Sequence, residues 1–479
     1  MDTISFDGIQ FYLPESVADI QLLIKQARTQ NVELRVCGAS HSVPKAIHTD
    51  LTKNGGNASI NLMLSKMYSV DIDKENNIVT VQAGCHLGFD PFDPTGISNE
   101  NNGLFVQLDK SGYAVPDMGG ITHQTVGGFL STGSSGGSTK YSFDEQLLSI
   151  TLIPADRDNP EPVTFSYSEN LDDPFFAAGV SMGLLGIIIS ASFKIIPRFN
   201  IKGCQFTTKI TEAKVDLFGI GGNGKPSLQQ FLQETEYSRL LWYAQPQVGK
   251  LVIWQAQQMN PDEPFTKKPY QELPEILGSY IPAELGADLV YTLIGKWPDW
   301  LKDILANNPQ MYDIIVSFIN SDFYPTILPL LMDIFVPLDN GSGPQQFEDS
   351  WYDGLPMDNN MSDKLFPVEF TELWIPIEKT IPVMAAMNQA YQTYYANKPG
   401  PGGALCTELY AAKASKFWMS PSYGCDVIRV DVFWFGNNTG SPADSFYPVF
   451  WNALKQFNFR GHWGKYLPGS TNPSWKGYI

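Results

Sequence analysis

The sequence predicts a two-domain α+β protein, and three observations lead to this fold class. The chain has 479 residues, enough for two large structural units or for about three of ordinary size. Apolar residues form 43% of it, which supplies a sizeable core and excludes a disordered chain. Strand-like runs occur together with helical periodicity both before and after a predicted junction at residues 198–200.

Before the junction, the sequence predicts one helix and several strands. The helix begins after residues 13–16, because a Pro and a Ser are followed by apolar residues at helical spacing. The β-rich runs that predict strands are residues 33–37, 59–63, 69–73, 78–83, 147–153 and 187–196. The last of these is rich in β-branched residues, which is typical of a buried strand.

After the junction, residues 240–256 predict two strands around a turn at 246–249. Residues 270–337 are rich in Trp, Leu, Ile and Pro and are predicted to be mostly helical, whereas residues 339–364 are predicted to form a polar loop. Alternation of strands and helices then resumes at residues 366–376, 379–395, 405–411 and 427–435.

The composition narrows the possible partners. The chain has 32 Lys and Arg against 50 Asp and Glu, a net charge of −18. Such an acidic chain repels phosphate backbones and anionic lipid, so neither nucleic acid nor a membrane surface is an expected partner. The five Cys residues are widely spaced without a Cys-x-x-Cys pair, which excludes a zinc module and a disulfide scaffold, and no metal site is expected.

The N-terminal residues have neither the basic region nor the apolar region of a signal peptide. No apolar run reaches the ~18 residues that a membrane-spanning helix needs. We therefore expect a cytoplasmic protein with no membrane span. The sequence carries no indication of its oligomeric state.

A compact motif, Arg35-Val-Cys-Gly38-Ala39-Ser40-His41-Ser42, directly follows a predicted strand. Its small residues leave backbone N–H groups available to surround an anion. The same residues also fit a tight turn with an exposed histidine, so the motif alone leaves both interpretations open.

Two further segments have unusual glycine content. Residues 119–138 are dense in Gly, Ser and Thr, which suits close backbone approach to a large phosphate-containing cofactor or, alternatively, a plain surface loop. They do not form the Gly-x-Gly-x-x-Gly fingerprint of dinucleotide folds. Residues 180–189 are mainly apolar, and Gly183 and Gly186 would let a helix end pack against a strand start. For this last segment alone, core packing is the simpler interpretation.

In this order and spacing, the three segments resemble the FAD domain of the vanillyl-alcohol-oxidase-type (PCMH-type) flavoproteins. Residues 234–257, residues 407–434 and the sequence His462-Trp463-Gly464-Lys465 are similar to the sugar-1,4-lactone oxidase and alditol oxidase branch of that family. The stretch 265–350 is not covered by the resemblance.

The resemblance implies a division of the chain into an FAD-binding domain at residues 1–198 and a substrate domain at 199–437, with an antiparallel sheet over the flavin. It also implies that the C-terminal segment, 438–479, returns to the FAD domain.

The resemblance further implies that His41 carries FAD through a covalent bond and that its loop binds the pyrophosphate. Some berberine-bridge-type relatives use a second, cysteine attachment in this domain. No Cys lies between residues 86 and 203 here, so one covalent bond is expected. The other implied cofactor-binding residues are Arg35, Gly38, Ala39, Ser40, Ser42, Gly119, Thr125, Gly128, Thr132, Gly133, Ser135, Gly136, Gly186, Ile187 and Ile189.

For catalysis, the resemblance implies that Lys465 lies beside the flavin. Its positive charge would stabilise the reduced cofactor, and its amine could help to deprotonate the substrate. His462 is expected to act as a hydrogen-bond partner of its neighbours rather than as a base.

Glu408 matches the acid of the Glu-x-Arg pair that holds substrate hydroxyls in alditol oxidases. Tyr410 stands where that pair has its arginine, so a single hydroxyl replaces a charged, planar fork. Asp431 stands about where alditol oxidases have a histidine. Glu372 is either a substrate contact or an ion-pair partner.

By resemblance, Gly119 occupies the position that controls access of O₂ to the flavin, and a glycine there favours an oxidase that releases H₂O₂. The expected reaction takes a hydride from a CH–OH group of a polyol, a sugar lactone or a related alcohol. A non-catalytic flavin-binding protein is a weaker alternative, since Lys465, Glu408 and Gly119 all fit an enzyme.

A second alternative concerns the substrate. Apolar side chains of the uncovered stretch could form either an ordinary helical core or a lid over a bulky hydrophobic or natural-product alcohol. These side chains are Trp297, Trp300, Leu301, Ile304, Met311, Ile314, Ile315, Phe318, Phe323 and Phe335.

Overall fold

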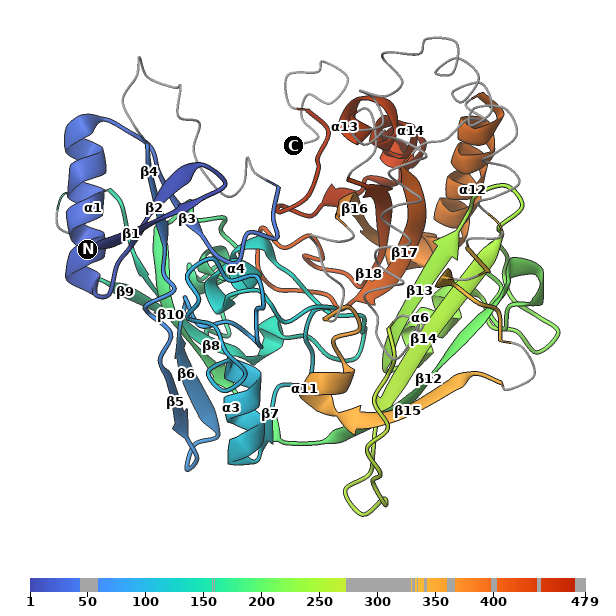
Figure 1. The fold of residues 1–479 in the computed structure, drawn as a ribbon, viewed down its shortest axis with the longest axis horizontal. Coiled ribbons are helices and arrows are strands. Elements are labelled where there is room, and N and C mark those ends of the chain that lie inside the picture. The colour runs from blue at the N-terminus through green and yellow to red at the C-terminus, as the bar shows by residue number, and fades with distance from the viewer. Residues whose placement is uncertain are drawn as a thin grey trace, which may run out of the picture.

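The structure is a computed structural model with two β-rich lobes. It describes residues 1–43, 59–156, 158, 160–272, 329, 332–333, 335–339, 343–359, 367–397, 403–436 and 441–469. Figure 1 shows the blue and cyan N-terminal lobe at the left and the green-to-red sheet of the second lobe at the right. No helix in these ranges is both long and apolar enough to cross a membrane.

The first sheet of the N-terminal lobe has the strand order β1-β2-β4-β3, with β2, β4 and β3 parallel. Its elements are β1 (Asp2–Phe6), β2 (Ile9–Leu13), α1 (Val17–Gln30), β3 (Leu34–Cys37) and β4 (Ile60–Met63). Helix α1 begins as predicted: Ser16 accepts a hydrogen bond from the backbone of Asp19, whose carboxylate accepts one from the backbone of Ser16.

The second sheet is antiparallel, with the order β5-β6-β10-β8-β9. Its strands are β5 (Val70–Asp73), β6 (Ile78–Gln82), β8 (Leu147–Ile153), β9 (Val163–Ser166) and β10 (Ile187–Lys194). The rest of the lobe consists of α3 (Leu104–Ser111), α4 (Val126–Thr132), α5 (Phe175–Ala178), a 3₁₀ turn at Asp144–Gln146 and the strand pair β7 (Tyr113–Ala114) and β11 (Ile196–Pro197). Helix α4 lies inside the glycine-rich segment, where the sequence did not predict a helix.

The second lobe is built on one antiparallel sheet with the order β15-β12-β14-β13-β17-β18-β16-β19. The strands are β12 (Asn200–Lys209), β13 (Tyr237–Tyr243), β14 (Lys250–Gln258), β15 (Gln345–Ser350), β16 (Val368–Pro376), β17 (Ala404–Ala412), β18 (Val427–Phe435) and β19 (Arg460–Gly461). The predicted α+β class with an antiparallel substrate-domain sheet is therefore confirmed.

Side chains alternate between the two faces of this sheet. One face is apolar, including Trp242, Leu409 and Val430, and forms a buried core with the helices behind it. The helical elements of this lobe are α6 (Leu228–Glu234), α11 (Trp351–Gly354), α12 (Thr380–Asn397), α13 (Pro442–Ser445), α14 (Tyr447–Leu454) and 3₁₀ turns at Ile210–Glu212, Ile377–Lys379 and Lys455–Phe457. The opposite face carries charged side chains, among them Glu372, Glu408 and Asp431, and is called the polar face below.

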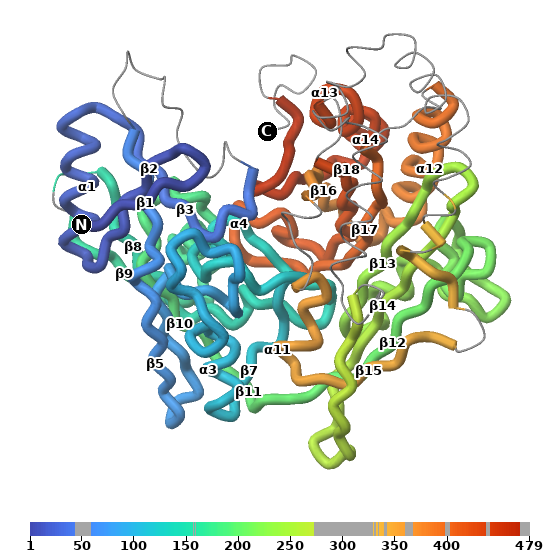
Figure 2. Tube along the Cα trace, viewed as in Figure 1, coloured from blue at the N-terminus to red at the C-terminus, as the bar shows by residue number. Residues whose placement is uncertain are grey.

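The described C-terminal residues divide between the lobes. Helix α14 packs against α12, behind the large sheet. Strand β19 pairs with β16, and the backbone N–H of Val43 donates to the carbonyl oxygen of Gly464 at 2.8 Å. Figure 2 shows this red segment running back toward the blue loop that follows β3. The C-terminus thus joins the first loop motif to the polar face of the sheet.

The stretch 265–350, which the resemblance does not cover, is described only in part. Phe335 lines the large cavity discussed below, and Met332 is buried beside it. The other apolar side chains proposed for a lid lie outside the described residues.

Candidate active site

A single cavity of about 1240 Å³ joins the two lobes. It extends from Ile24 and Arg28 on α1, past the loop after β3, to the polar face of the large sheet. Its volume and length suit a large elongated ligand together with a small one.

The loop after β3 packs tightly on the start of α4. A side chain at Gly38 would place its Cβ 2.5 Å from the Oγ1 of Thr125, so this contact requires glycine. Thr125 caps α4 by accepting a hydrogen bond from the N–H of Gly128 at 3.2 Å. Ser40 has a φ of +63°, which turns the chain sharply before His41. The first two glycine-containing motifs therefore form one wall of the cavity.

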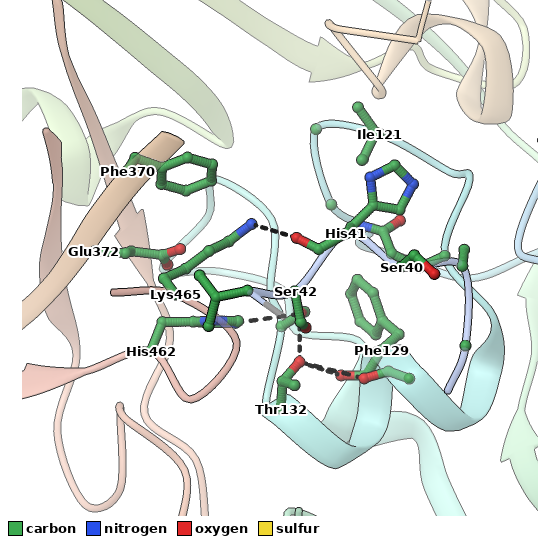
Figure 3. A pocket seen from close by; sticks show the side chains of 18 of the residues that line it. Ser40, His41, Ser42, Ile121, Phe129, Thr132, Phe370, Glu372, His462 and Lys465 are labelled. Carbon is green, nitrogen blue, oxygen red and sulfur yellow. Dashed lines mark hydrogen bonds between the residues drawn. The ribbon is translucent and has the colours of Figure 1, made fainter. Parts of the chain in front are cut away.

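The side chain of Lys465 points toward the backbone carbonyl of His41, whose imidazole ring lies on the side of Ile121 (Figure 3). The amine of Lys465 donates to the carbonyl oxygen of His41 at 3.3 Å and lies 4.0 Å from the centre of the Phe370 ring. The His41 ring lies 5.6 Å from that of His123, which does not itself line the cavity. The predicted attachment site and the predicted cation are thus neighbours in space although 424 residues apart in sequence.

His462 is held between the lobes by its two ring nitrogens. Its Nδ1 accepts a hydrogen bond from the backbone N–H of Gly464 at 3.1 Å, so Nε2 carries the proton and donates to Ser134 Oγ at 3.3 Å. Burial lowers the pKa of His462 to about 4. The ring is therefore neutral at physiological pH, which supports a positioning role.

Three carboxylates stand side by side on the polar face of the sheet. Glu372 on β16 is in register with Asp431 on β18, and Asp431 is in register with Glu408 on β17. Side chains of directly paired residues are only about 4.5–5.5 Å apart at Cβ. Such close carboxylates cannot all be ionised without cations nearby.

A buried arginine, Arg429, supplies one of these cations from the next row of the sheet. Its Nε and Nη2 contact the same oxygen of Glu372 at 2.9 and 2.8 Å, and its Nη1 donates to the carbonyl oxygen of Ser135 at 2.9 Å. Its guanidinium carbon lies 4.8 and 4.7 Å from the ring centres of Trp374 and Tyr410, its register neighbours on the flanking strands. Although residue 410 is a tyrosine, the neighbouring Arg429 gives the site a fixed positive charge.

The three carboxyl groups differ in their pKa values because they share Arg429 unequally. Burial opposes ionisation of Glu372, but Arg429, together with His462, Lys465 and the hydrogen bond from Trp374, outweighs it and lowers the pKa of that carboxyl. Burial and the Glu372 charge raise the pKa of Asp431 well above its ordinary value. Burial, followed by Asp358, raises the pKa of Glu408 to about 8. Within this row, ionisation is therefore favoured at Glu372 and disfavoured at Asp431 and Glu408.

Most of the predicted site residues line this cavity. They are Arg35, Gly38, Ala39, Ser40, His41, Ser42, Gly119, Thr125, Gly128, Thr132, Ser135, Gly186, Ile187, Glu372, Glu408, Tyr410, Asp431, His462 and Lys465.

Three predicted cofactor-binding residues do not line the cavity. Gly133 ends α4 with a φ of +69°. The N–H of Gly136 donates to the buried Asp117 at 3.1 Å, and Ile189 lies in the buried strand β10. Each of the three has a local structural role in this position.

The sequence interpretation missed Arg429, Arg239 and Asp358, all of which line the cavity. Arg239 on β13 pairs with Asp358 and approaches Glu408 to 3.7 Å. The sequence does contain a signal for Arg429 and Arg239. Each is a charged residue within an otherwise largely apolar strand, on the same face as other polar residues. Asp358 lies in a polar loop and had no such signal.

The cavity suits FAD at the end formed by the loop motifs. The Nε of Arg35 and the Oε1 of Gln124 line it and are buried without a hydrogen-bond partner among the described residues. Buried polar atoms usually have a partner, so a polar ligand here would satisfy both. Small residues at 38–40, 119–120 and 127–128 leave room for close approach of such a ligand.

Comparison with known proteins agrees with this assignment. Residues 9–88 match the family model described as "FAD binding domain". The chain is 29% identical to L-gulonolactone oxidase from Mus musculus over 235 residues, 49% of this chain and 45% of that protein. It is 27% identical to D-arabinono-1,4-lactone oxidase from Kluyveromyces lactis over 266 residues, 53% and 42% of the two chains. The alignments thus span less than half of either relative.

A longer alignment exists at lower identity. L-gulonolactone oxidase from Scyliorhinus torazame is 22% identical over 470 residues, 97% of this chain and 87% of that protein. Among solved structures, a variant of cholesterol oxidase from Brevibacterium sterolicum has a TM-score of 0.64 at 14% identity and covers 97% of this chain and 86% of its own. At that identity the likeness concerns the fold alone.

The family model covers the first part of the FAD-binding motifs, the long alignment extends the relationship over the chain, and the fold agrees. Residues 9–88 therefore match an FAD-binding domain, and the chain as a whole is similar to the vanillyl-alcohol-oxidase-type, PCMH-type FAD-binding flavoproteins.

Proposed function

We propose that this protein is an FAD-dependent oxidase that takes a hydride from a CH–OH group of a polyol, a sugar lactone or a related alcohol and passes the electrons to O₂, giving H₂O₂. One observation carries the proposal: a single cavity joins the His41 loop and Lys465 to a sheet face bearing Glu408 and Tyr410. The lactone oxidases among the relatives support this substrate class.

In this proposal the loop at 35–42, residues 119–135 and residues 186–187 hold FAD, and His41 forms the single covalent bond to it. Bound FAD would supply the hydride acceptor and the route of electrons to oxygen. The FAD-binding unit comprises residues 1–198 and part of the C-terminal segment after 438, and the substrate unit comprises residues 199–437. The described contacts of Val43 with Gly464 support this return of the C-terminus.

The polar face then supplies the proton chemistry and the charge. Lys465, held beside His41, contributes the positive charge that a reduced flavin anion needs. Glu408 accepts a hydrogen bond from Tyr410 at 2.8 Å and is the candidate acceptor of the substrate hydroxyl proton. Glu372 acts as the ion-pair partner of Arg429 rather than as a substrate contact, because both its close charged contacts are with that arginine.

An absorption spectrum before and after acid precipitation tests the cofactor, and a peroxide assay over alcohols and lactones tests the reaction. Oxidised-flavin bands in the pellet and peroxide with a polyol or lactone are the expected results. A colourless protein that cannot be reconstituted with FAD contradicts the proposal. Bound flavin that no alcohol or lactone reduces under anaerobic conditions would instead indicate a non-catalytic flavin-binding protein.

A second candidate substrate class is a bulky hydrophobic alcohol. One wall of the same cavity is apolar and includes Leu241, Val252, Met332 and Phe433. The peroxide assay should therefore also include a long-chain alcohol and a sterol, and a preference for these over every polyol would favour this candidate.

Glu408→Gln is expected to remove a pH dependence near pH 8. With a pKa of about 8, Glu408 becomes a proton acceptor only as pH rises toward that value. In the unmodified protein kcat/KM should rise up to about pH 8 and then level off. The glutamine variant should lose this rise and fall by roughly 100-fold or more at pH 9. A pH profile of peroxide formation measures both.

Glu408→Gln should also change how the free energy of unfolding depends on pH, in a direction that the pKa of Glu408 determines. The folded-state pKa of Glu408 lies above its ordinary value of 4.5, so the folded protein keeps a proton that the unfolded chain releases. The contribution of Glu408 to the free energy of unfolding is therefore largest below pH 4.5 and is lost as pH rises toward 8. Thermal unfolding of the glutamine variant should show a weaker decline over this range. An unchanged pH profile in both assays would contradict the assignment.

Gly119→Ala is expected to slow the reaction of the reduced enzyme with O₂ several-fold. An added Cβ would lie 3.3 Å from Phe129 Cε2 and 3.4 Å from the carbonyl oxygen of Ile121, so it fits with small adjustments. Stopped-flow reoxidation measures the effect, and anaerobic reduction of the same variant by substrate serves as the control. Equal slowing of both half-reactions would argue against an oxygen-access role.

A further inference from the structure

We propose that Arg239, Asp358 and Gly120, on the side of Glu408 away from Lys465, form a subsite that recognises neighbouring hydroxyl groups of the substrate. The inference deepens the proposed function and rests on it, because the ligand is the substrate of the same cavity. It names the ligand class: a neutral compound with at least two adjacent free hydroxyls beyond the one that is oxidised.

The order of the strands defines this side of the cavity. Glu408 lies on β17, between β18 on one side and β13 on the other. The C-terminal segment with Lys465 follows β19, which pairs with β16 beyond β18. Arg239 lies on β13. At about 4.8 Å per strand, Arg239 is three strands, or roughly 14 Å, from the strand that bears Glu372.

Arg239 is a buried guanidinium with unused hydrogen-bonding capacity. The residue is 3% exposed. Its Nη1 pairs with Asp358 and lies 3.7 Å from Glu408 Oε1, and its Nη2 donates to the hydroxyl of Tyr270 at 3.3 Å. Its Nε has no hydrogen-bond partner among the described residues. A ligand oxygen would satisfy a donor whose burial is otherwise costly.

Asp358 is brought into the cavity by a loop that is fixed to the other lobe. Its backbone N–H donates to the carbonyl oxygen of Gly120 at 3.0 Å. The side chain of the next residue, Asn359, accepts from the N–H of Thr122 at 2.8 Å and donates to its hydroxyl at 3.0 Å. The Asp358 side chain is 27% exposed, against 4% for Arg239 and 8% for Glu408. It is therefore the most accessible charged group of this cluster.

Gly120 keeps a space open between two of these groups. A Cβ added there would lie 3.2 Å from Asp358 Oδ2 and 3.2 Å from the hydroxyl of Tyr410. Two polar groups from different segments thus converge on a point that glycine leaves empty of side chain. A side chain at residue 120 would crowd both groups, so glycine leaves them accessible to a ligand from the cavity.

The chemistry of the cluster selects its ligand. Carboxylate oxygens accept from hydroxyls, while the tyrosine hydroxyl and the guanidinium can donate to them. The Asp358 carboxylate, the most accessible charged group of the cluster, disfavours an anionic ligand. An apolar alcohol would bury these groups without partners, and a site built around substrate hydroxyls can reject such analogues by about 10⁴-fold. The subsite therefore favours a polyol or lactone over the hydrophobic candidate.

Binding to the flavin-loaded protein tests the subsite without relying on turnover. Under anaerobic conditions, the rate of flavin reduction is followed by stopped-flow absorbance at increasing concentrations of xylitol, sorbitol, L-gulono-1,4-lactone and 1-hexanol, and its saturation gives the dissociation constant of each probe. At least one polyhydroxylated probe should give a saturable spectral change at a concentration where 1-hexanol gives none. Asp358→Asn and Gly120→Ala should each weaken that binding about tenfold or more, in line with the loss of one charged hydrogen bond or its space.

The matched control is Asp353→Asn, on α11 in the same segment but outside the cavity, where Asp353 contacts Lys267 at 2.7 Å. It should bind the polyol normally. Gly120→Ala removes no charge, so it tests the subsite independently if Asp358→Asn fails to fold. Thermal unfolding shows whether each of the two variants is folded. The proposal is overturned if no polyhydroxylated probe perturbs the flavin, or if both variants bind as the unmodified protein does. Peroxide formed from 1-hexanol without polyol binding would overturn the subsite yet leave the oxidase proposal intact.

Discussion

Replacing His41 by alanine is expected to turn an acid-stable flavin into one that acid releases. In the unmodified protein the flavin should stay with the precipitated polypeptide, and in the variant it should move entirely to the supernatant. The effect is all-or-none because the side chain of His41 is the proposed point of attachment.

The substitution should leave non-covalent binding largely intact. Lys465 contacts the backbone carbonyl of residue 41, and Val43 pairs with Gly464, so neither contact needs the imidazole. The variant should therefore still elute with flavin from a sizing column at neutral pH. Absorbance of the pellet and the supernatant after acid treatment gives the decisive measurement.

His123→Gln is the matched control, because that imidazole lies only 5.6 Å from His41 but does not line the cavity. It should keep the flavin in the pellet. If the glutamine variant released the flavin and the alanine variant did not, the attachment would have to be moved to His123. If the unmodified protein released its flavin, the proposed FAD binding would stand without the covalent bond.

The sequence predicted well the elements whose signals are local. The start of α1 depends on Ser16 and Asp19, which interact with neighbouring backbone groups only, and it is confirmed. Helix α4 was missed for the opposite reason. Gly127 and Gly128 are poor helix formers, but a side chain at Gly127 would approach Ala83 to 3.0 Å, so tertiary packing requires glycine there.

The candidate site was predictable only where a contiguous motif marks it. The His41 loop and the C-terminal Lys465 are identified by such motifs. Arg429 contacts Glu372 and Tyr410, which lie on the two neighbouring strands. The strand register that brings the three residues together is fixed by the whole sheet, so no local motif predicts it. The consequence of Tyr410 replacing the arginine could not be predicted for this reason: the fixed charge beside it comes from Arg429, on another strand.

Replacing Arg429 by methionine is expected to cost about 3–5 kcal/mol of folding free energy, because it leaves the Glu372 carboxylate buried without its partner. The arginine also donates to the carbonyl oxygens of Ser135 and Gly136, at 2.9 and 3.3 Å, and so joins the glycine-rich segment to the substrate sheet. The methionine variant should therefore bind flavin more weakly as well. Arg429→Lys should recover only part of either loss, since an ammonium lacks the planar fork and the stacking on both rings.

The loss of stability should depend on pH with a definite sign. The pKa of Glu372 is lowered in the folded protein, so its favourable contribution is present at neutral pH and is lost as pH falls through that pKa. Without Arg429, burial would raise the pKa, and the carboxyl could be accommodated at pH 5 as a neutral acid. Denaturant unfolding at pH 5 and pH 8 should thus show the larger difference between variant and unmodified protein at pH 8.

The double variant Arg429→Met with Glu372→Gln separates the ion pair from packing. Glutamine keeps an acceptor for the indole N–H of Trp374, which donates to Glu372 at 2.8 Å, but removes the buried charge. The double variant should be more stable than Arg429→Met alone at pH 8, with a coupling energy of about 1–3 kcal/mol in a double-mutant cycle. Additive effects would mean that Arg429 stabilises the sheet through its carbonyl and ring contacts, and that Glu372 does not depend on it for its charge.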